Sequence, residues 1–374
     1  MNEKEIINTM ILSRLCYYSL TAVKQLYLEA GSATAVVENR NNIKDIIPDA
    51  TSKLVEILRD CEVMRPRAEE EWQYTQKYGI RPLIYIDDDY PRRLRECADA
   101  PLILYYKGNA DLNQKRIVNI VGTRRCTLYG QDVIRRFITD LRSLLPHVII
   151  VSGLAYGVDI CAHRQALEQG MDTVGVLAHG LDTIYPHAHR ATAKAMVSHG
   201  GLLTEFMSHT NADKINFVRR NRIVAGISDA CILVESAAHG GGLITAEISR
   251  GYSREVFAVP GRVGDTYSEG CNNLIRDNGA ILLTDASTFV KTMGWENDIV
   301  LEQAKSNGIQ QPVFPDLSVA EQRIVDTLHR NNDLHVNMLA AQSGLTLSQL
   351  TSLLFELEMK GIVKGLAGGT YHLM

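Results

Sequence analysis

The spacing of apolar residues changes along the chain and divides it into parts. Up to about residue 65, "EKEIINTMILSRL", "TAVKQLYLEAG" and "TSKLVEILRDCEVM" place apolar side chains every three or four positions, which predicts separate helices. From residue 116 on, short apolar runs such as "RIVNIVG", "VIIVSG" and "ACILVES" alternate with helical segments. That alternation is typical of a parallel sheet covered on both faces. We therefore predict an α/β fold, with a Rossmann-like doubly wound parallel sheet over residues 80–295.

The first 70 residues are expected to form a helical module. In "LYLEAGSATAVVE" the Gly-Ser pair would end one helix, and a short second helix would follow it. This order is similar to a helix-hairpin-helix (SAM-like) module. The turn expected before it, "CYYSLTA", lacks the Gly-x-Gly that would cradle a phosphate. Packing or binding of a partner is therefore favoured over DNA binding for residues 1–70.

The end of the chain separates into a linker and a small domain. The polar stretch "NDIVLEQAKSNGIQQPVFPDL" predicts a linker over residues 296–316. Residues 317–374 predict three helices followed by a small hairpin, with Gly344 at a turn, which is the order of a winged helix. Acidic side chains slightly outnumber basic ones here, so a protein partner is favoured over duplex DNA.

Charge and cysteine content limit the class of protein further. The net charge of −4 and pI near 6.3 mean that any polyanion must be bound by a local patch. The seven cysteines are scattered singly and form no CxxC pair. The first residues are too charged for a secretory signal, and no apolar run approaches the length of a membrane span. We expect a cytoplasmic protein with reduced thiols and no membrane partner.

Four turns carry glycine where predicted strands end, namely "VGTRR", "SGLAYGVD", "LAHGLD" and "ESAAHGGGLITAE". Ligands of doubly wound sheets collect at that rim, and glycine lets the backbone approach them, so the four turns favour a phosphate-bearing ligand. None has the GxGxxG or GxxxxGK[ST] spacing of nucleotide-binding loops. Arg124 stands where arginine can hold a phosphate by two parallel hydrogen bonds. For Arg125 two roles remain equally open, namely contact with a phosphate and a surface position in which water solvates the side chain.

The stretch "KINFVRRNR" precedes the predicted strand "ACILVES" and should begin a helix near Phe217. Its cations and its aromatic ring are the parts of a groove for single-stranded nucleic acid, where cations hold phosphates and the ring stacks on a base. Helical spacing places Arg219 and Arg222 on the same face of this helix and predicts that Arg220 points away from that face. In an alternative interpretation Asn221 and Arg222 are structural, with an ion pair from the helix to Glu235 or Asp229.

Two other interpretations involve a metal or a reaction. Asp159 and His163, at i and i+4, could bind a metal with His179, His187 and His189, but helix capping and loop bonding explain them without a metal. We expect no metal and no cofactor. "ESAAHGGGLITAE" is similar to the phosphate loop of Rossmann-like enzymes that cleave N-glycosidic bonds of nucleoside monophosphates, with Glu247 at the catalytic position. That enzyme class is the alternative function, and a pure adaptor protein is a third.

Three long stretches together resemble the DNA processing protein A (DprA/Smf) family: "SGLAYGVDICAHRQAL", "FVRRNRIVAGISDACILVESAAHGGGLITAE" and "VPGRVGDTYSEGCNNLIRDNGAILLTD". The resemblance covers residues 80–290. It implies a non-catalytic, cytoplasmic protein of natural transformation that protects incoming single-stranded DNA and helps to load the recombinase RecA. It also implies a homodimer formed through the Rossmann-like domain. The DNA-binding residues that it implies are Gly122, Arg124, Gly153, Lys214, Phe217, Arg219, Asn221 and Arg222.

Overall fold

The computed structural model describes residues 2–48, 50–296, 317–366 and 369–373. The chain divides into two compact units, Met1–Trp295 and Glu296–Met374. From residue 297 on, the predicted linker lies outside the described residues. In the described part of the chain, no helix has the length and apolar character needed to cross a membrane.

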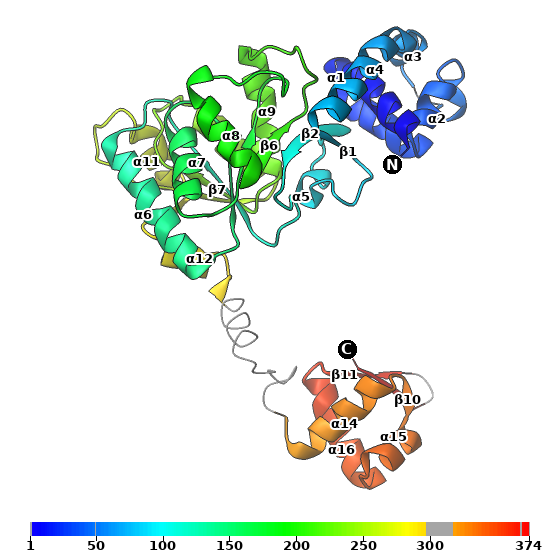
Figure 1. Ribbon diagram of the computed structural model, residues 1–374. Helices are drawn as coiled ribbons and strands as arrows, with labels where there is room; N and C mark the ends of the chain where they lie inside the picture. The colour runs from blue at the N-terminus through cyan, green and yellow to red at the C-terminus, as the bar shows by residue number, and fades with distance from the viewer. Residues whose placement is uncertain (1, 49, 297–316, 367–368, 374) are drawn as a thin grey trace. The chain divides into compact units, whose positions relative to one another are not determined.

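A twisted sheet forms the centre of the first unit, and nine of its strands lie in the described residues (Figure 1). The strands are β1 (Arg81–Ile84), β2 (Ile103–Gly108), β3 (Ile117–Val121), β4 (Ile149–Ser152), β5 (Thr173–Val176), β6 (Gly200–Thr204), β7 (Ala230–Leu233), β8 (Glu255–Ala258) and β9 (Ile281–Leu282). Their order is β1-β2-β6-β5-β4-β3-β7-β8-β9. All neighbours from β6 to β9 are parallel, whereas β2 is antiparallel to β6 and to β1.

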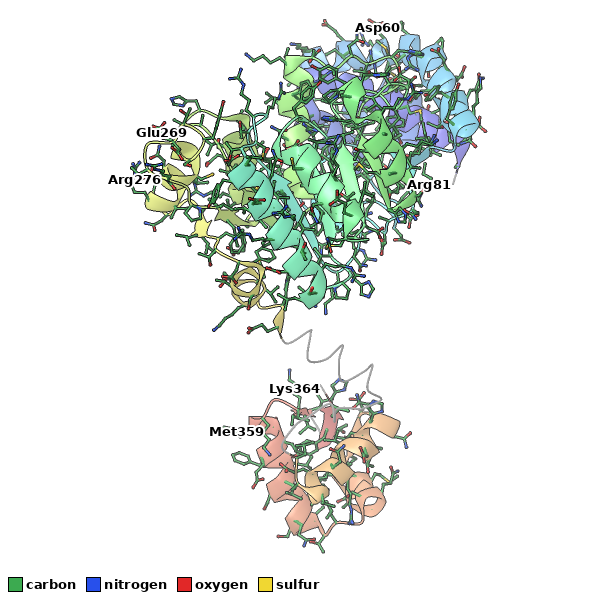
Figure 2. The ribbon with its side chains drawn as sticks, turned by 60° about the vertical axis from the view of Figure 1, so that its left-hand side comes forward. Asp60, Arg81, Glu269, Arg276, Met359 and Lys364 are labelled. Atoms are coloured by element: carbon green, nitrogen blue, oxygen red, sulfur yellow. The ribbon has the colours of Figure 1, made fainter. Side chains whose placement is uncertain are left out.

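Helices cover both faces of this sheet, which confirms the predicted Rossmann-like α/β fold. One face carries α6 (Leu128–Leu144), α7 (Val158–Glu168), α8 (Arg190–Ser198) and α12 (Ala286–Thr292). The other carries α5 (Arg92–Arg95), α9 (Lys214–Gly226), α10 (Gly241–Gly251) and α11 (Glu269–Arg276), whose end residues are labelled in Figure 2. The short 3-10 helix η3 (His187–His189) precedes α8. Because both faces are covered, every residue of β3, β4, β5, β6 and β7 is buried.

The N-terminal helices pack against the β1–β2 edge of the same unit. They are α1 (Glu3–Ala30), α2 (Ala33–Glu38), η1 (Ile43–Asp45), α3 (Ser52–Arg59), η2 (Cys61–Met64) and α4 (Arg65–Tyr78). The prediction of two helices with a turn at "CYYSLTA" is wrong, since α1 runs unbroken for 28 residues. Neither Gly nor Pro interrupts it before Gly31, which ends it at φ +76.

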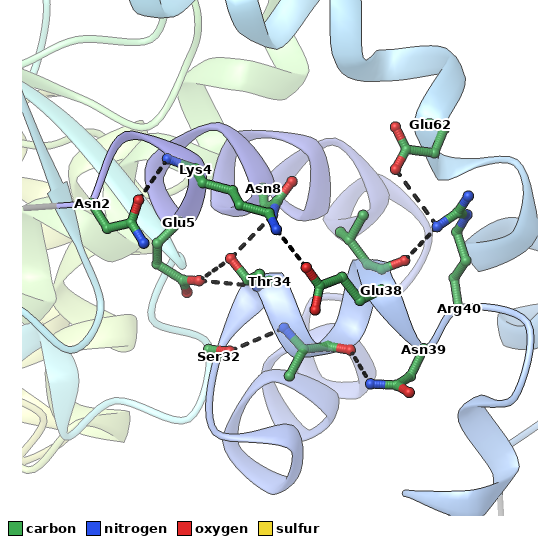
Figure 3. A network of polar contacts seen from close by, with 12 residues as sticks. Asn2, Lys4, Glu5, Asn8, Ser32, Thr34, Glu38, Asn39, Arg40 and Glu62 are labelled. Atoms are coloured by element: carbon green, nitrogen blue, oxygen red, sulfur yellow. Dashed lines mark hydrogen bonds and ion pairs between the residues drawn. The ribbon is translucent and has the colours of Figure 1, made fainter.

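A carboxylate joins the first two of these helices. Glu5 accepts hydrogen bonds from the Ala33 and Thr34 backbone amides and from the Thr34 hydroxyl, at 2.7, 3.0 and 2.6 Å (Figure 3). These amides belong to the first turn of α2, where N–H groups have no partner inside the helix. The α1–α2 corner is therefore held by side-chain capping.

The second unit has the order of a winged helix. Its elements are α14 (Val319–Arg330), β10 (Leu334–His335), α15 (Val336–Ser343), α16 (Leu347–Met359), β11 (Val363–Leu366) and β12 (Thr370–Leu373). The strands pair antiparallel in the order β10-β12-β11. Gly344 ends α15 at φ +70, at the turn that the sequence predicts. Capping boxes start α14 at Ser318 and α16 at Thr346.

Candidate functional site

The strand order of the sheet reverses at β3, which pairs with β4 on one side and with β7 on the other. Ligands of doubly wound sheets bind at such a switch point, outside the carboxyl ends of the strands. A groove of about 660 Å³ lies there. Its lining comes from residues 121–124 at the end of β3, from Gly153 and Ala155 after β4, from residues between 237 and 245 around the start of α10, and from one side of α9.

Two of the predicted glycines are required by close packing in this groove. A Cβ on Gly122 would lie 2.7 Å from the carbonyl oxygen of Glu235, so the loops after β3 and β7 touch through their backbones. A Cβ on Gly153 would lie 2.3 Å from the Arg220 guanidinium. Both glycines shape the groove, and Gly153 does so by leaving room for a buried cation.

The groove is electropositive. Arg124, Lys214 and Arg220 line it, and the acidic residue among its described lining residues is Asp159. The Asp159 carboxylate accepts hydrogen bonds from the backbone amides of Gly153 and Ala155, at 3.1 and 3.3 Å, so it serves its own loop. Burial raises the pKa of Asp159, and the nearby Arg220 opposes that rise. The arrangement suits an anion.

Arg220 lies under the groove, so the prediction that it turns away is wrong. It is only 4% exposed, and its Nη1 donates to the carbonyl oxygens of Gly153, at 2.6 Å, and Val176. Burial lowers the pKa of Arg220 to about 10, which leaves it charged at neutral pH. On a helical wheel Arg220 stands roughly 60° from Phe217, whereas Arg219 stands roughly 160° away. A helical wheel centred on Phe217 would therefore have identified Arg220 as a groove residue from the sequence alone.

Helix α9 also begins earlier than expected. It starts at Lys214 rather than near Phe217, because the Asp213 carboxylate caps it by accepting from the Asn216 amide at 2.8 Å. An Asp directly before the basic stretch is an N-cap signal that the sequence contains. The earlier start places Lys214 in the first turn, at the rim of the groove.

Phe217 is the aromatic centre of the site. The Arg124 guanidinium lies 4.9 Å from its ring centroid, and that of Arg220 lies 5.8 Å away. Phe217 is half-buried, while Arg124 and Lys214 are exposed. A ring with two cations beside it can stack on a base while the cations hold the adjoining phosphates.

Arg222 is occupied by the fold. It is buried, pairs with Glu205 and donates to the carbonyl oxygen of Asp99 at 2.5 Å. These contacts agree with the alternative, structural interpretation of Arg222, but its ion-pair partner is Glu205 rather than Glu235 or Asp229. Burial raises the pKa of the Glu205 carboxylate, and the charges of Arg222 and Arg219 oppose that rise. Arg219 is absent from the described lining of the groove.

The structure thus brings most of the predicted DNA-binding residues together. Those that line the groove are Gly122, Arg124, Gly153, Lys214, Phe217 and Asn221. Asn221 accepts from Nε of Arg220 at 3.3 Å, so it also orients that cation. Arg219 and Arg222 are not among the described lining residues of the groove, whereas Arg220 is.

The residues of the metal and enzyme interpretations have other partners. His163 contacts the Thr173 hydroxyl at 2.6 Å, and burial lowers its pKa to about 3, so it is neutral. Within the described ranges, no three His, Cys, Asp or Glu side chains are grouped to hold a metal ion. Glu247 is exposed, pairs with Arg250 at 3.2 Å and does not line the groove. The alternative enzyme therefore lacks its expected catalytic carboxylate at this site.

A cationic, aromatic-centred groove at the switch point of a Rossmann-like sheet, with a winged helix further along the chain, is an arrangement typical of α/β proteins that bind anions. Residues 81–294 match the family described as DNA recombination-mediator protein A, and residues 310–369 match the DprA winged helix domain. The chain belongs to this DprA/Smf family, as the resemblance of its motifs indicated.

Individual relatives agree with this assignment. The chain is 33% identical over 313 residues to a putative DNA processing protein DprA of Mycobacterium tuberculosis, which covers 80% of this chain and 78% of the relative. It resembles the crystal structure of Streptococcus pneumoniae DprA with a TM-score of 0.63 and 31% identity, over 77% of this chain and 96% of that one. Helicobacter pylori DprA, described for its single-stranded DNA binding mode, matches with a TM-score of 0.52 and 28% identity, over 57% and 95%.

Proposed function

We propose that the groove binds single-stranded DNA, with Arg124, Lys214 and Arg220 facing phosphates and Phe217 stacking on a base. The observation that carries the proposal is the Phe217 ring with two guanidinium groups within 6 Å of its centroid. The single-stranded DNA binding of the Helicobacter pylori relative supports it. Gly122, Gly153 and Asn221 shape the groove, and Arg222 holds α9 to Glu205.

The salt dependence of binding tests the number of phosphate contacts. Three cations at about 0.7 counterions per phosphate predict a slope of about −2 for log affinity against log salt. Lys214→Ala should lower the affinity and reduce the slope to roughly −1.4, whereas the exposed Lys291→Ala on α12 should change neither. Fluorescence anisotropy with labelled oligonucleotides measures both. Tight binding of a mononucleotide without binding of oligonucleotides would instead favour the enzyme alternative.

We further propose that the protein acts in natural transformation without catalysis, protecting incoming single strands and helping to load RecA on them. The family's description as a recombination mediator supports this role. The helices of residues 1–70 and the winged helix are proposed to bind proteins. On α16, where a DNA-reading winged helix would carry cations, Phe355 is 66% exposed. Met359 on the same helix, labelled in Figure 2, is 75% exposed.

A homodimer through the Rossmann-like domain is part of the proposal. Among the described strands β9 ends the sheet, and its Ile281 and Leu282 are 38% and 45% exposed. An apolar edge strand is a site for pairing with another chain. Sedimentation equilibrium should therefore find two copies for the wild type and one for Leu282→Lys. An unchanged mass in the variant would place the dimer contact elsewhere.

A further inference from the structure

Tyr185 lies beside the groove, on the loop whose glycine turn "LAHGLD" the sequence placed at the ligand-binding rim, although no role in binding was predicted for the tyrosine itself. This loop follows β5, and its tyrosine ring reaches Phe217 on α9, with 5.9 Å between the ring centroids and 58° between the ring planes. The side chain is 49% exposed. Half of a large aromatic surface is thus left open next to the Phe217 ring.

The loop that carries Tyr185 is held in place by a buried histidine. The Tyr185 backbone amide donates to Nε2 of His179 at 3.2 Å, and Nδ1 of His179 contacts the Gly180 carbonyl oxygen at 2.8 Å. His179 is 1% exposed, and burial lowers its pKa, so it stays neutral and keeps an acceptor nitrogen at neutral pH. The backbone that carries the Tyr185 ring is therefore already held in place before a ligand arrives, which reduces the entropic cost of binding.

The geometry of the two rings excludes a single sandwiched base, because planes 58° apart cannot both lie flat against it. Their separation of 5.9 Å also exceeds the roughly 3.4 Å rise per nucleotide in a duplex strand. Two bases that stack on these rings would be separated from each other. Such an arrangement suits an unpaired strand whose bases are splayed, and disfavours a duplex.

We propose that Tyr185 stacks on the nucleobase next to the one on Phe217, so that the bound strand continues from the groove across the loop after β5. This subsite rests on the proposed binding of single-stranded DNA. Cations that hold phosphates, followed by aromatic rings for successive bases, are the general design of single-strand sites. Tyr185 would thereby favour single strands over duplex DNA.

Anisotropy with oligothymidylates, and with the same strands carrying one abasic position, tests this subsite. Tyr185→Ala should weaken binding by about 5- to 10-fold, the lower end for a stacked base because the ring is half-exposed, and Tyr185→Phe should bind like the wild type. The matched control is Tyr78→Ala, an exposed tyrosine on α4. When the abasic position faces residue 185, the wild type and Tyr185→Ala should bind the strand with the same, reduced affinity.

Cross-linking of wild-type protein to 5-iodouracil oligonucleotides gives a second readout that needs no variant, with the Tyr185 peptide as the expected product. Unchanged affinity of Tyr185→Ala, or cross-links that map only to other peptides, would overturn the inference while Lys214→Ala still reports the proposed function. A wild type that binds no single-stranded DNA would overturn the proposed function, and this subsite with it.

Discussion

Glu205→Ala is expected to lower the free energy of unfolding of the first unit by about 3–5 kcal/mol, because Arg222 would keep its charge in the interior after losing the carboxylate with which it pairs. The side chains of Arg222 and Glu205 are 11% and 15% exposed, so water can do little to replace the lost partner. The Asp99 carbonyl oxygen would remain as an acceptor for Arg222, and the Asp99 carboxylate, which accepts a hydrogen bond from Tyr252, would remain as a nearby negative charge that is not paired with Arg222. Urea unfolding followed by tryptophan fluorescence measures the change, since Trp72 and Trp295 both belong to the first unit.

The double variant Glu205→Leu/Arg222→Met provides the control for this prediction. Replacing both members of a buried pair with apolar residues removes the stranded charge, so much of the lost stability should return. Both variants should bind single-stranded DNA at temperatures where they are folded, since neither residue lines the groove. A loss below about 1 kcal/mol in Glu205→Ala would mean that the pair behaves like an exposed ion pair.

Phe217→Ala is expected to weaken single-stranded DNA binding by about 1–3 kcal/mol, or roughly 5- to 150-fold. The truncation removes the stacking face and also the ring beside which the Arg124 and Arg220 guanidinium groups lie. Phe217→Trp keeps an aromatic face and should retain most of the affinity. Anisotropy titrations at one fixed salt concentration measure all three proteins, because the electrostatic part of the affinity changes with salt.

The matched control for Phe217 is Ile215→Ala on the same helix. Ile215 is 69% exposed and does not line the groove, so its truncation tests whether a change on α9 by itself disturbs binding. If Phe217→Ala bound as tightly as Ile215→Ala, the ring would be a packing residue and the cations alone would hold the strand.

Much of the fold could be predicted from local patterns. Runs of four to seven apolar residues predicted the parallel strands, since a strand buried on both faces needs no polar side chains. Gly344 marked the end of a helix because glycine, which has no Cβ, adopts positive φ without strain. The long helix α1 was divided wrongly at residues 16–22, where polar and aromatic side chains imitate a turn although no residue there breaks a helix.

The sequence by itself determined the types of residue at the site and the rim of the sheet that carries them. Only the tertiary structure decided which arginine serves which purpose. Arg220 finds its acceptors at Gly153 and Val176, 67 and 44 positions away, and Arg222 finds Glu205, 17 positions away. A buried guanidinium must satisfy its donors, and the groups that do so meet it only once the sheet has assembled. Tyr185 meets Phe217 for the same reason.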